Sequence, residues 1–192
     1  MRIALVLLLA AAPALAQRFE PSRPYEEDGW GRRPLEGIYL GIAGGGQLMI
    51  VPSSDFDTGD AAFGYDGELR LGYSVGVPLQ IYLSGSIDGS TFGAGFNQAT
   101  LRTEMIAVFL QTHLYARPQL MVYARGGIGV GLSADVTVDG TSTAGFAAAG
   151  GLGFEIRLQP GLYLAPEVFY KNMDLSGLDV SMIGLQLGLV YY

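Results

Sequence analysis

The chain has 192 residues, of which 49% are hydrophobic and only 15% are charged, and 29 are glycine. The absence of cysteine excludes disulfides, thiolate catalysis and thiolate metal sites, and the single histidine, His113, leaves histidine-based acid–base chemistry and metal binding short of residues. A net charge of −7 argues against a nucleic-acid partner. We therefore expect no cofactor and no bound metal.

The first 35 residues predict export rather than a folded element. Residues 1–16 have the layout of a secretory signal peptide: Arg2 supplies the positive charge, an apolar core too short to span a bilayer follows, and small residues stand at the spacing required for cleavage after Ala16. A buried N-terminal helix is the alternative. Residues 17–35 are rich in proline and charge and lack periodicity, which predicts a flexible periplasmic arm. We expect residues 36–192 to form the folded domain.

Apolar and polar side chains alternate strictly in the rest of the chain. The clearest example is the segment 64–75, where Leu69 and Leu71 share one face and Glu68 and Arg70 share the other. A period of two is the signature of a strand with two different faces. The segment 101–115 is the least clear because both of its faces carry bulk. The pattern predicts eight strands, at residues 37–50, 64–75, 79–87, 101–115, 120–132, 145–158, 162–171 and 181–192.

The connections between these segments alternate in length. Proline recurs at near-regular separations, and the connections that hold Pro78, Pro118 and Pro160 are tight. Proline belongs at turns because it cannot donate to a strand ladder. The other connections are longer and polar, around 51–62, 88–98, 133–143 and 172–179. This fourfold hairpin repeat predicts an up-and-down antiparallel topology.

Alternation alone does not say which face lies inside. A soluble, lipocalin-like barrel would bury the Leu/Ile face, whereas a membrane barrel exposes it to lipid. The opposite face is dominated by Gly, Ala and Ser, as a narrow interior requires, and long connections alternate with short ones, as in outer-membrane barrels. Outward aromatic residues fall near strand ends, where two interfacial girdles would lie: Tyr65, Phe146 and Tyr170 by the long connections, and Tyr73 and Tyr191 by the turns. We therefore predict an all-β, eight-stranded antiparallel up-and-down transmembrane β-barrel.

The signal peptide, the eight alternating segments, the short proline turns and the aromatic C-terminal segment IGLQLGLVYY resemble the small eight-stranded bacterial outer-membrane β-barrels, such as the OmpA transmembrane domain and the OmpX/Ail group. The resemblance covers about residues 35–192 and is one of pattern, not of a diagnostic motif. It implies a place in the outer membrane, among its lipid and lipopolysaccharide. It also implies insertion by the barrel-assembly machinery, which recognises a terminal strand ending in an aromatic residue. Here the apolar phase runs through Tyr191, and Tyr192 adds one residue beyond it.

The predicted inward face carries charges of both signs. In so narrow a lumen opposite charges should pair, because leaving a buried ion alone costs several kcal/mol. The charges can form a structural plug or a gate for a conductive path, and we favour the plug because eight strands leave room for side chains and little else. The predicted lumen charge cluster comprises Asp66, Glu68, Arg70, Arg125, Glu155, Arg157, Glu167 and Lys171. Inward tyrosines near the turn ends predict an aromatic floor at the periplasmic mouth, with packing against glycines as the alternative: Tyr39, Tyr82, Tyr123 and Tyr163.

No catalytic constellation stands out in the sequence. His113 is followed by Leu114 and Tyr115, so the His-x-Ser pair of outer-membrane lipid A deacylases is missing, and a structural histidine is favoured. The aspartates of the loop 51–62 lack the bidentate glutamate of a calcium loop, which favours a solvated acidic loop. The sequence thus favours a non-enzymatic barrel with a structural or surface-interaction role. A low-conductance channel and an adhesin acting through its external loops are the alternatives, and any external ligand stays unidentified.

Overall fold

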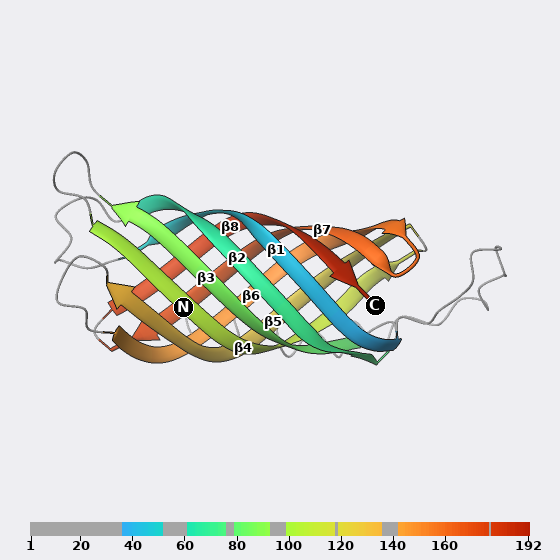
Figure 1. Cartoon of the computed structure of the whole chain (residues 1–192), viewed down its shortest axis with the longest axis horizontal. Helices are drawn as coiled ribbons and strands as arrows, with labels where there is room; N and C mark the ends of the chain where they lie inside the picture. Colours follow the sequence, from blue (N-terminus) through green and yellow to red (C-terminus); the bar gives the residue numbers. More distant parts are fainter. Residues whose placement is uncertain are drawn as a thin grey trace.

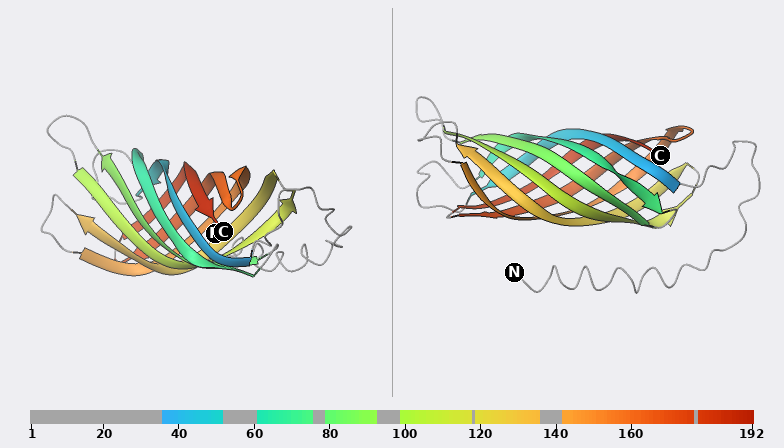
Figure 2. Two further views of the ribbon diagram at one scale, coloured as in Figure 1. Left: turned by 45° about the vertical axis from the view of Figure 1, so that its right-hand side comes forward. Right: turned by 60° about the horizontal axis from the view of Figure 1, so that its bottom comes forward.

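The computed structural model describes residues 36–51, 61–75, 79–92, 99–117, 119–135, 142–176 and 178–192. They form one closed barrel of tilted, antiparallel strands (Figures 1 and 2). The strands are β1 Glu36–Ile50, β2 Ala61–Val75, β3 Leu79–Phe92, β4 Ala99–Ala116, β5 Leu120–Asp135, β6 Ser142–Gln159, β7 Leu162–Leu175 and β8 Leu178–Tyr191. Each pairs with its neighbour in sequence, and β1 pairs with β8, where Leu40 lies opposite Tyr191. The predicted fold is confirmed.

Two parts of the sequence prediction cannot be compared with this barrel. The predicted signal peptide and arm, residues 1–35, lie outside the described residues, as do the loop aspartates at 55, 57 and 60. In the part of the chain that the structure describes, no helix is long and apolar enough to cross a membrane.

Strand length corrects the predicted connections. A tilted strand needs about 9–11 residues to cross a bilayer, but these strands have 14 to 18. The prediction of a long loop at 172–179 is wrong: β7 and β8 pair as far as Leu175 and Leu178, so only residues 176–177 connect them. Likewise β3 runs to Phe92, into the predicted loop 88–98. Side chains become polar beyond the apolar band, but backbone pairing does not depend on side-chain polarity, so the strand ladder continues past the band.

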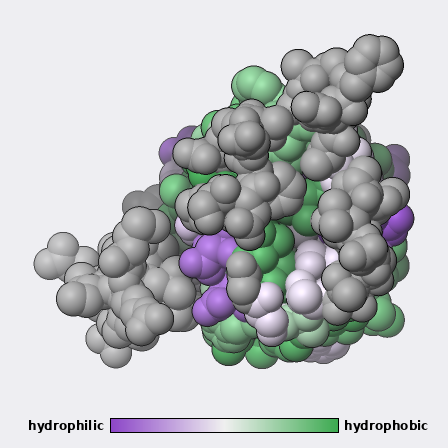
Figure 3. All heavy atoms as spheres, turned by 90° about the vertical axis from the view of Figure 1, so that its left-hand side faces the viewer, coloured by the Kyte–Doolittle hydropathy of each residue, from purple (hydrophilic) through white to green (hydrophobic). Residues whose placement is uncertain are grey.

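The side chains confirm which face is outside. The Leu/Ile face points away from the lumen, with exposed fractions of 64% for Ile38 and Leu69 and 66% for Leu185. The expected girdle aromatics also point outward, and all of them are at least one-third exposed. Figure 3 views the barrel from the end that holds the longer connections. Hydrophobic residues lie along the outer wall, and hydrophilic residues gather near this end of the barrel. An apolar outer band of this kind is what lipid requires.

Two bulges change the predicted alternation. The register of β4 on β5 shifts between His113 and Tyr115, and both Leu114 and Tyr115 are more than one-third exposed. Strict alternation through residues 101–115 predicts that Tyr115 shares the inward face of His113, and this prediction is wrong because an extra residue in the strand reverses the phase beyond it. A second shift, between Arg157 and Gln159, lies at the turn that joins β6 to β7.

Candidate functional site

The lumen is filled by three kinds of side chain. Toward the long connections, the inward positions mix small polar side chains with methionines, and Met49, Met105, Met173 and Met182 are at most 1% exposed. Charged groups occupy the middle of the strands, and aromatic rings gather towards the turns. The charged middle is the candidate site, because several of its ionisable side chains meet away from water.

Two arginines and two glutamates form the centre, which we call the plug: Glu68, Arg70, Arg125 and Glu167. Arg125 donates to both oxygens of Glu68, at 2.6 and 2.8 Å, and through Nε to Glu167 at 2.5 Å. Arg70 donates to Glu68 at 2.9 Å and to Glu167 at 3.1 Å. The four side chains come from β2, β5 and β7 and are at most 2% exposed. Two positive and two negative charges make the plug neutral.

Neutral donors satisfy the remaining lone pairs of the plug carboxylates. Ser84 donates to Glu68 at 2.6 Å, and Gln186 donates to it at 3.1 Å. Tyr123 donates to Glu167 at 2.6 Å. The absent side chain of Gly151 makes room for Glu167, since an added Cβ would lie 2.9 Å from its carboxyl carbon. Charge-assisted bonds in this number fix the geometry of the plug.

A second charged group lies beside the plug. The ammonium group of Lys171, on β7, donates to Asp66 on β2 and to Asp88 on β3, the latter at 2.9 Å. All three side chains are at most 1% exposed. We call these three residues the Lys171 triad. One ammonium faces two carboxylates, so the triad carries one negative charge in excess.

A third group surrounds Glu155 near the turn end. Its carboxylate accepts hydrogen bonds from His113 Nε2 at 2.9 Å, from Gln111 at 2.9 Å and from Tyr192 Oη at 2.8 and 2.9 Å. The side chain of His113 is fully buried. His113 therefore has a buried carboxylate as its partner.

The floor of the lumen contains one ring that the sequence prediction missed. Tyr39 lies 5.1 Å from Tyr82, and the ring of Tyr192 lies 5.3 Å from Tyr39 and 5.4 Å from Tyr163. The missed ring is that of Tyr192: the alternation that puts Tyr191 on the outer face predicts that Tyr192 points inward. The fourth predicted member, Tyr123, lies in the charged layer instead and bonds to the plug.

The structure does not form one cluster of the eight predicted residues: four make the plug, Asp66 and Lys171 belong to the triad, Glu155 has its own neutral and histidine partners, and one residue lies apart. Arg157 makes no ion pair with any described residue, is only half-buried and lies beside the second bulge. Its backbone N–H donates to Gln119 O at 3.0 Å, across the turn end of β5 and β6. Sequence reasoning missed Asp88, although the period of two that predicts Ser84 and Ser86 inside extends to it. It was missed because the strand was expected to end at residue 87.

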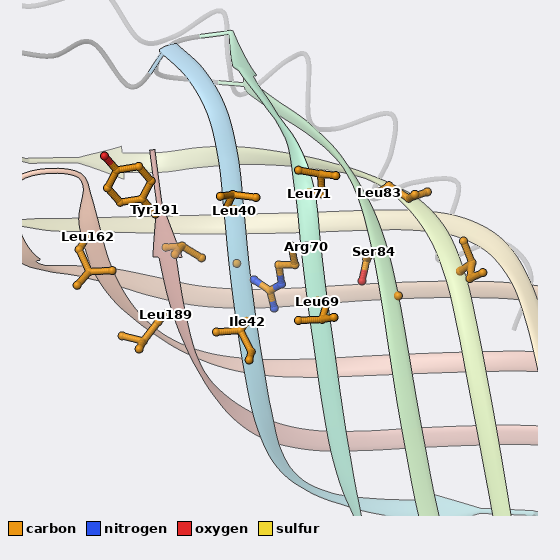
Figure 4. Close-up of a pocket in the computed structure, with 14 residues that line it drawn as sticks. Leu40, Ile42, Leu69, Arg70, Leu71, Leu83, Ser84, Leu162, Leu189 and Tyr191 are labelled. Carbon is orange, nitrogen blue, oxygen red and sulfur yellow. The ribbon is translucent and has the colours of Figure 1, made fainter.

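A depression of about 650 Å³ lies on the outer wall across β8, β1, β2 and β3 (Figure 4). Most of the residues that line it are apolar, such as Leu40, Ile42 and Leu69, although Arg70 and Ser84, which bond to Glu68 in the lumen, also belong to its lining. A surface of this character fits lipid chains and carries no chemistry of its own. The lumen therefore remains the only candidate site in the described part of the chain.

Comparisons with known proteins fit this architecture. The family model described as outer membrane protein beta-barrel domain matches residues 3–192. Among solved structures, Neisserial surface protein A gives a TM-score of 0.66 at 11% identity, over 80% of this chain and 96% of that one. Ail of Yersinia pestis, in complex with the heparin analogue sucrose octasulfate, gives 0.52 at 15% identity, over 81% and 99%. OprG from Pseudomonas aeruginosa gives 0.51 at 15% identity, over 83% and 98%. A comparison with curated proteins finds none that matches.

Proposed function

Because the chain belongs to the outer membrane protein β-barrel family, we propose that it is a non-enzymatic membrane protein whose lumen is closed by its own ion-paired side chains. Its role is then structural, or it acts on the surroundings through its external connections. On this proposal residues 1–16 are removed after Ala16, residues 17–35 form a periplasmic arm, and the barrel-assembly machinery inserts the barrel among outer-membrane lipid and lipopolysaccharide.

The observation that carries the proposal is the plug. Arg125 on β5 reaches Glu68 on β2 and Glu167 on β7 at the same time, so the bonds extend across the lumen rather than along its wall. An open path would have to separate these buried partners, and each separated ion would lose several kcal/mol. Because the two positive and two negative charges of the plug cancel, there is no net repulsion within the plug that would favour its opening.

The absence of enzymatic activity is supported by the surroundings of His113. Its Nε2 is bound to Glu155, and its ring lies 6.4 Å from that of Tyr123 in an edge-on arrangement. Among the described residues, no serine or threonine hydroxyl is hydrogen-bonded to it, so a nucleophile–base pair is missing.

Planar-bilayer recording of the purified full chain tests the proposal against the channel alternative. We expect no current steps above those of the lipid alone. A double replacement of the central pair, Glu68→Ala with Arg125→Ala, removes the bridge across the lumen and should produce steps, which shows that the assay can detect an open lumen. The matched control is Arg102→Ala, since Arg102 pairs with Glu104 on the outside, where both side chains are 44% exposed. Steps from the wild-type protein would establish the low-conductance channel instead.

The adhesin alternative requires a partner for the external connections. The similar Ail structure holds a heparin analogue, a polyanion. The net charge of −7 opposes such a ligand here. Deletion of residues 93–98 is the appropriate test of cell-surface binding. Deletion of the predicted loop 88–98 is not, because it would remove Asp88, a partner of Lys171 inside the barrel.

A further inference from the structure

The Lys171 triad holds a buried charge that nothing in the described residues neutralises. Lys171 is shared between Asp66 and Asp88. The two buried arginines of the lumen, Arg70 and Arg125, are already engaged by the two carboxylates of the plug. An uncompensated carboxylate in a lumen is unfavourable, and proteins neutralise it with a proton or a bound cation.

The strands that hold Asp66 and Asp88, and the strands beside them, carry buried oxygen atoms without partners. Within the described residues, Asp66 Oδ2, Gln47 Oε1, Ser90 Oγ and Thr103 Oγ1 are buried and have no hydrogen-bond partner. The four residues are at least nine-tenths buried, and Thr103 is fully so. Buried oxygens are normally satisfied, so four of them on inward positions of β1 to β4 are available to a ligand.

The register places these oxygens on adjoining inward positions of four consecutive strands. Asp66 on β2 lies opposite Asp88 on β3, which lies opposite Thr103 on β4. In the next inward row, Gln47 on β1 and Ser90 on β3 flank Gly64.

Gly64 and Gln47 show how this row is arranged. Gly64 has no side chain, and the Ser90 hydroxyl occupies the space where a Cβ would stand. The amide nitrogen of Gln47 is held by Tyr65 O at 3.1 Å, which leaves its carbonyl oxygen available.

We propose that these oxygens and Asp66 form a lumen site for a small monovalent cation of the sodium or potassium kind. Carboxylate, amide carbonyl and hydroxyl oxygens are the ligands that hard cations prefer. A single positive charge neutralises the triad, whereas a divalent ion would leave a positive charge beside the Lys171 ammonium. The ion would tie β1 to β4 together next to the plug, on the side of the long connections.

The test measures folding stability of the full chain in detergent at mildly alkaline pH. The fraction folded is read from the mobility of unheated samples on gels over a urea series. Sodium or potassium chloride is exchanged for N-methyl-D-glucamine chloride at constant ionic strength. Because one ion binds only the folded barrel, we expect the folding equilibrium constant to rise about tenfold for each tenfold increase in the cation above its Kd.

Two variants locate the effect. Asp66→Asn removes the excess charge and keeps the shape, so it should be independent of the cation and more stable than wild type in N-methyl-D-glucamine. Thr103→Val changes no charge and should weaken the cation dependence. The matched control is Ser133→Ala: Ser133 lies opposite Thr103, but its hydroxyl is paired with that of Thr143 at 2.6 Å, so its loss should lower stability and leave the cation dependence intact.

Three results would overturn the proposal. Equal stability of the wild type in all three salts would mean that water or a proton satisfies the site. A dependence on pH with none on sodium or potassium would assign the charge to a shared proton. A cation dependence that persists in both Asp66→Asn and Thr103→Val would place the binding elsewhere, and Thr103→Val alone decides this if Asp66→Asn does not fold.

Discussion

Replacement of Arg125 by methionine is the most direct perturbation of the plug. The Arg125 guanidinium makes three hydrogen bonds to Glu68 and Glu167, of 2.5, 2.6 and 2.8 Å, and the side chain is 2% exposed. Methionine keeps a flexible apolar stem but leaves Arg70 as the single cation between two carboxylates. Because removal of one partner strands a buried charge, we expect the free energy of unfolding to fall by about 3–5 kcal/mol.

The assay is urea unfolding in detergent, followed by the mobility of unheated samples, since a closed barrel resists detergent while its backbone pairing is intact. A second variant, Arg125→Met with Glu167→Gln, restores a neutral plug in which Arg70 faces Glu68 alone. Replacing both partners leaves no stranded charge, so we expect this double variant to recover most of the loss. Residues in direct contact typically couple by about 0.5–3 kcal/mol, which the cycle of single and double variants measures.

Two outcomes would refute this reasoning. One is an Arg125→Met stability within about 0.5 kcal/mol of wild type, which is the range of ordinary surface substitutions. The other is a double variant no more stable than the single one. Arg102→Met is the matched control, because its pair with Glu104 is as short, at 2.8 Å, but exposed, and exposed pairs contribute about 0–1 kcal/mol.

Two further pairs of substitutions compare the inside of the wall with the outside. Gly151→Ala places a methyl group against the Glu167 carboxylate and should lower the free energy of unfolding in urea by about 1–3 kcal/mol. At Gly85 an added Cβ meets nothing within 4 Å, so Gly85→Ala should lower it by less than about 1 kcal/mol. Equal losses of stability in the two variants would contradict the packing argument. Tyr192→Phe keeps the ring of the floor but deprives two buried partners of its hydroxyl, so it should cost about 1–3 kcal/mol. Tyr191→Phe, on the outer face, should leave stability unchanged, and a matching loss there would show that the inward position of Tyr192 is unimportant.

The number of strands and their faces follow from the sequence because a period of two assigns every residue to a side. Leu69 and Arg70 must lie on opposite faces of β2, and only the apolar face can meet lipid, so burial could be predicted strand by strand once the barrel is assigned to a membrane. The positions of β-bulges, by contrast, could not be predicted from the alternation. Nothing in the order of Leu114 and Tyr115 marks the bulge between His113 and Tyr115, and the error at Tyr115 follows from that one extra residue.

Contacts across the lumen could not be predicted in this way. Glu68 and Arg125 stand 57 positions apart, and whether they meet depends on the tilt and stagger of the closed barrel, which alternation does not specify. The same stagger keeps Arg157 out of the cluster. The stagger also brings Asp88 to Lys171. Asp88 lies in a part of β3 that the sequence predicts as loop because its side chains are polar.

The alternating pattern itself explains why the lumen holds charged side chains rather than only apolar ones. A strand with apolar residues on both faces would become a continuous hydrophobic run, and about 18 such residues are read as a transmembrane helix. In β5, Arg125 interrupts the apolar positions between Met121 and Val130, so this segment does not resemble a transmembrane helix. The polar groups must then be neutralised once they leave water, since an unpaired buried charge is prohibitively costly. Cross-lumen pairs such as Glu68–Arg125 meet both requirements: each strand is polar enough to avoid a helical span, and the plug of the folded barrel is neutral.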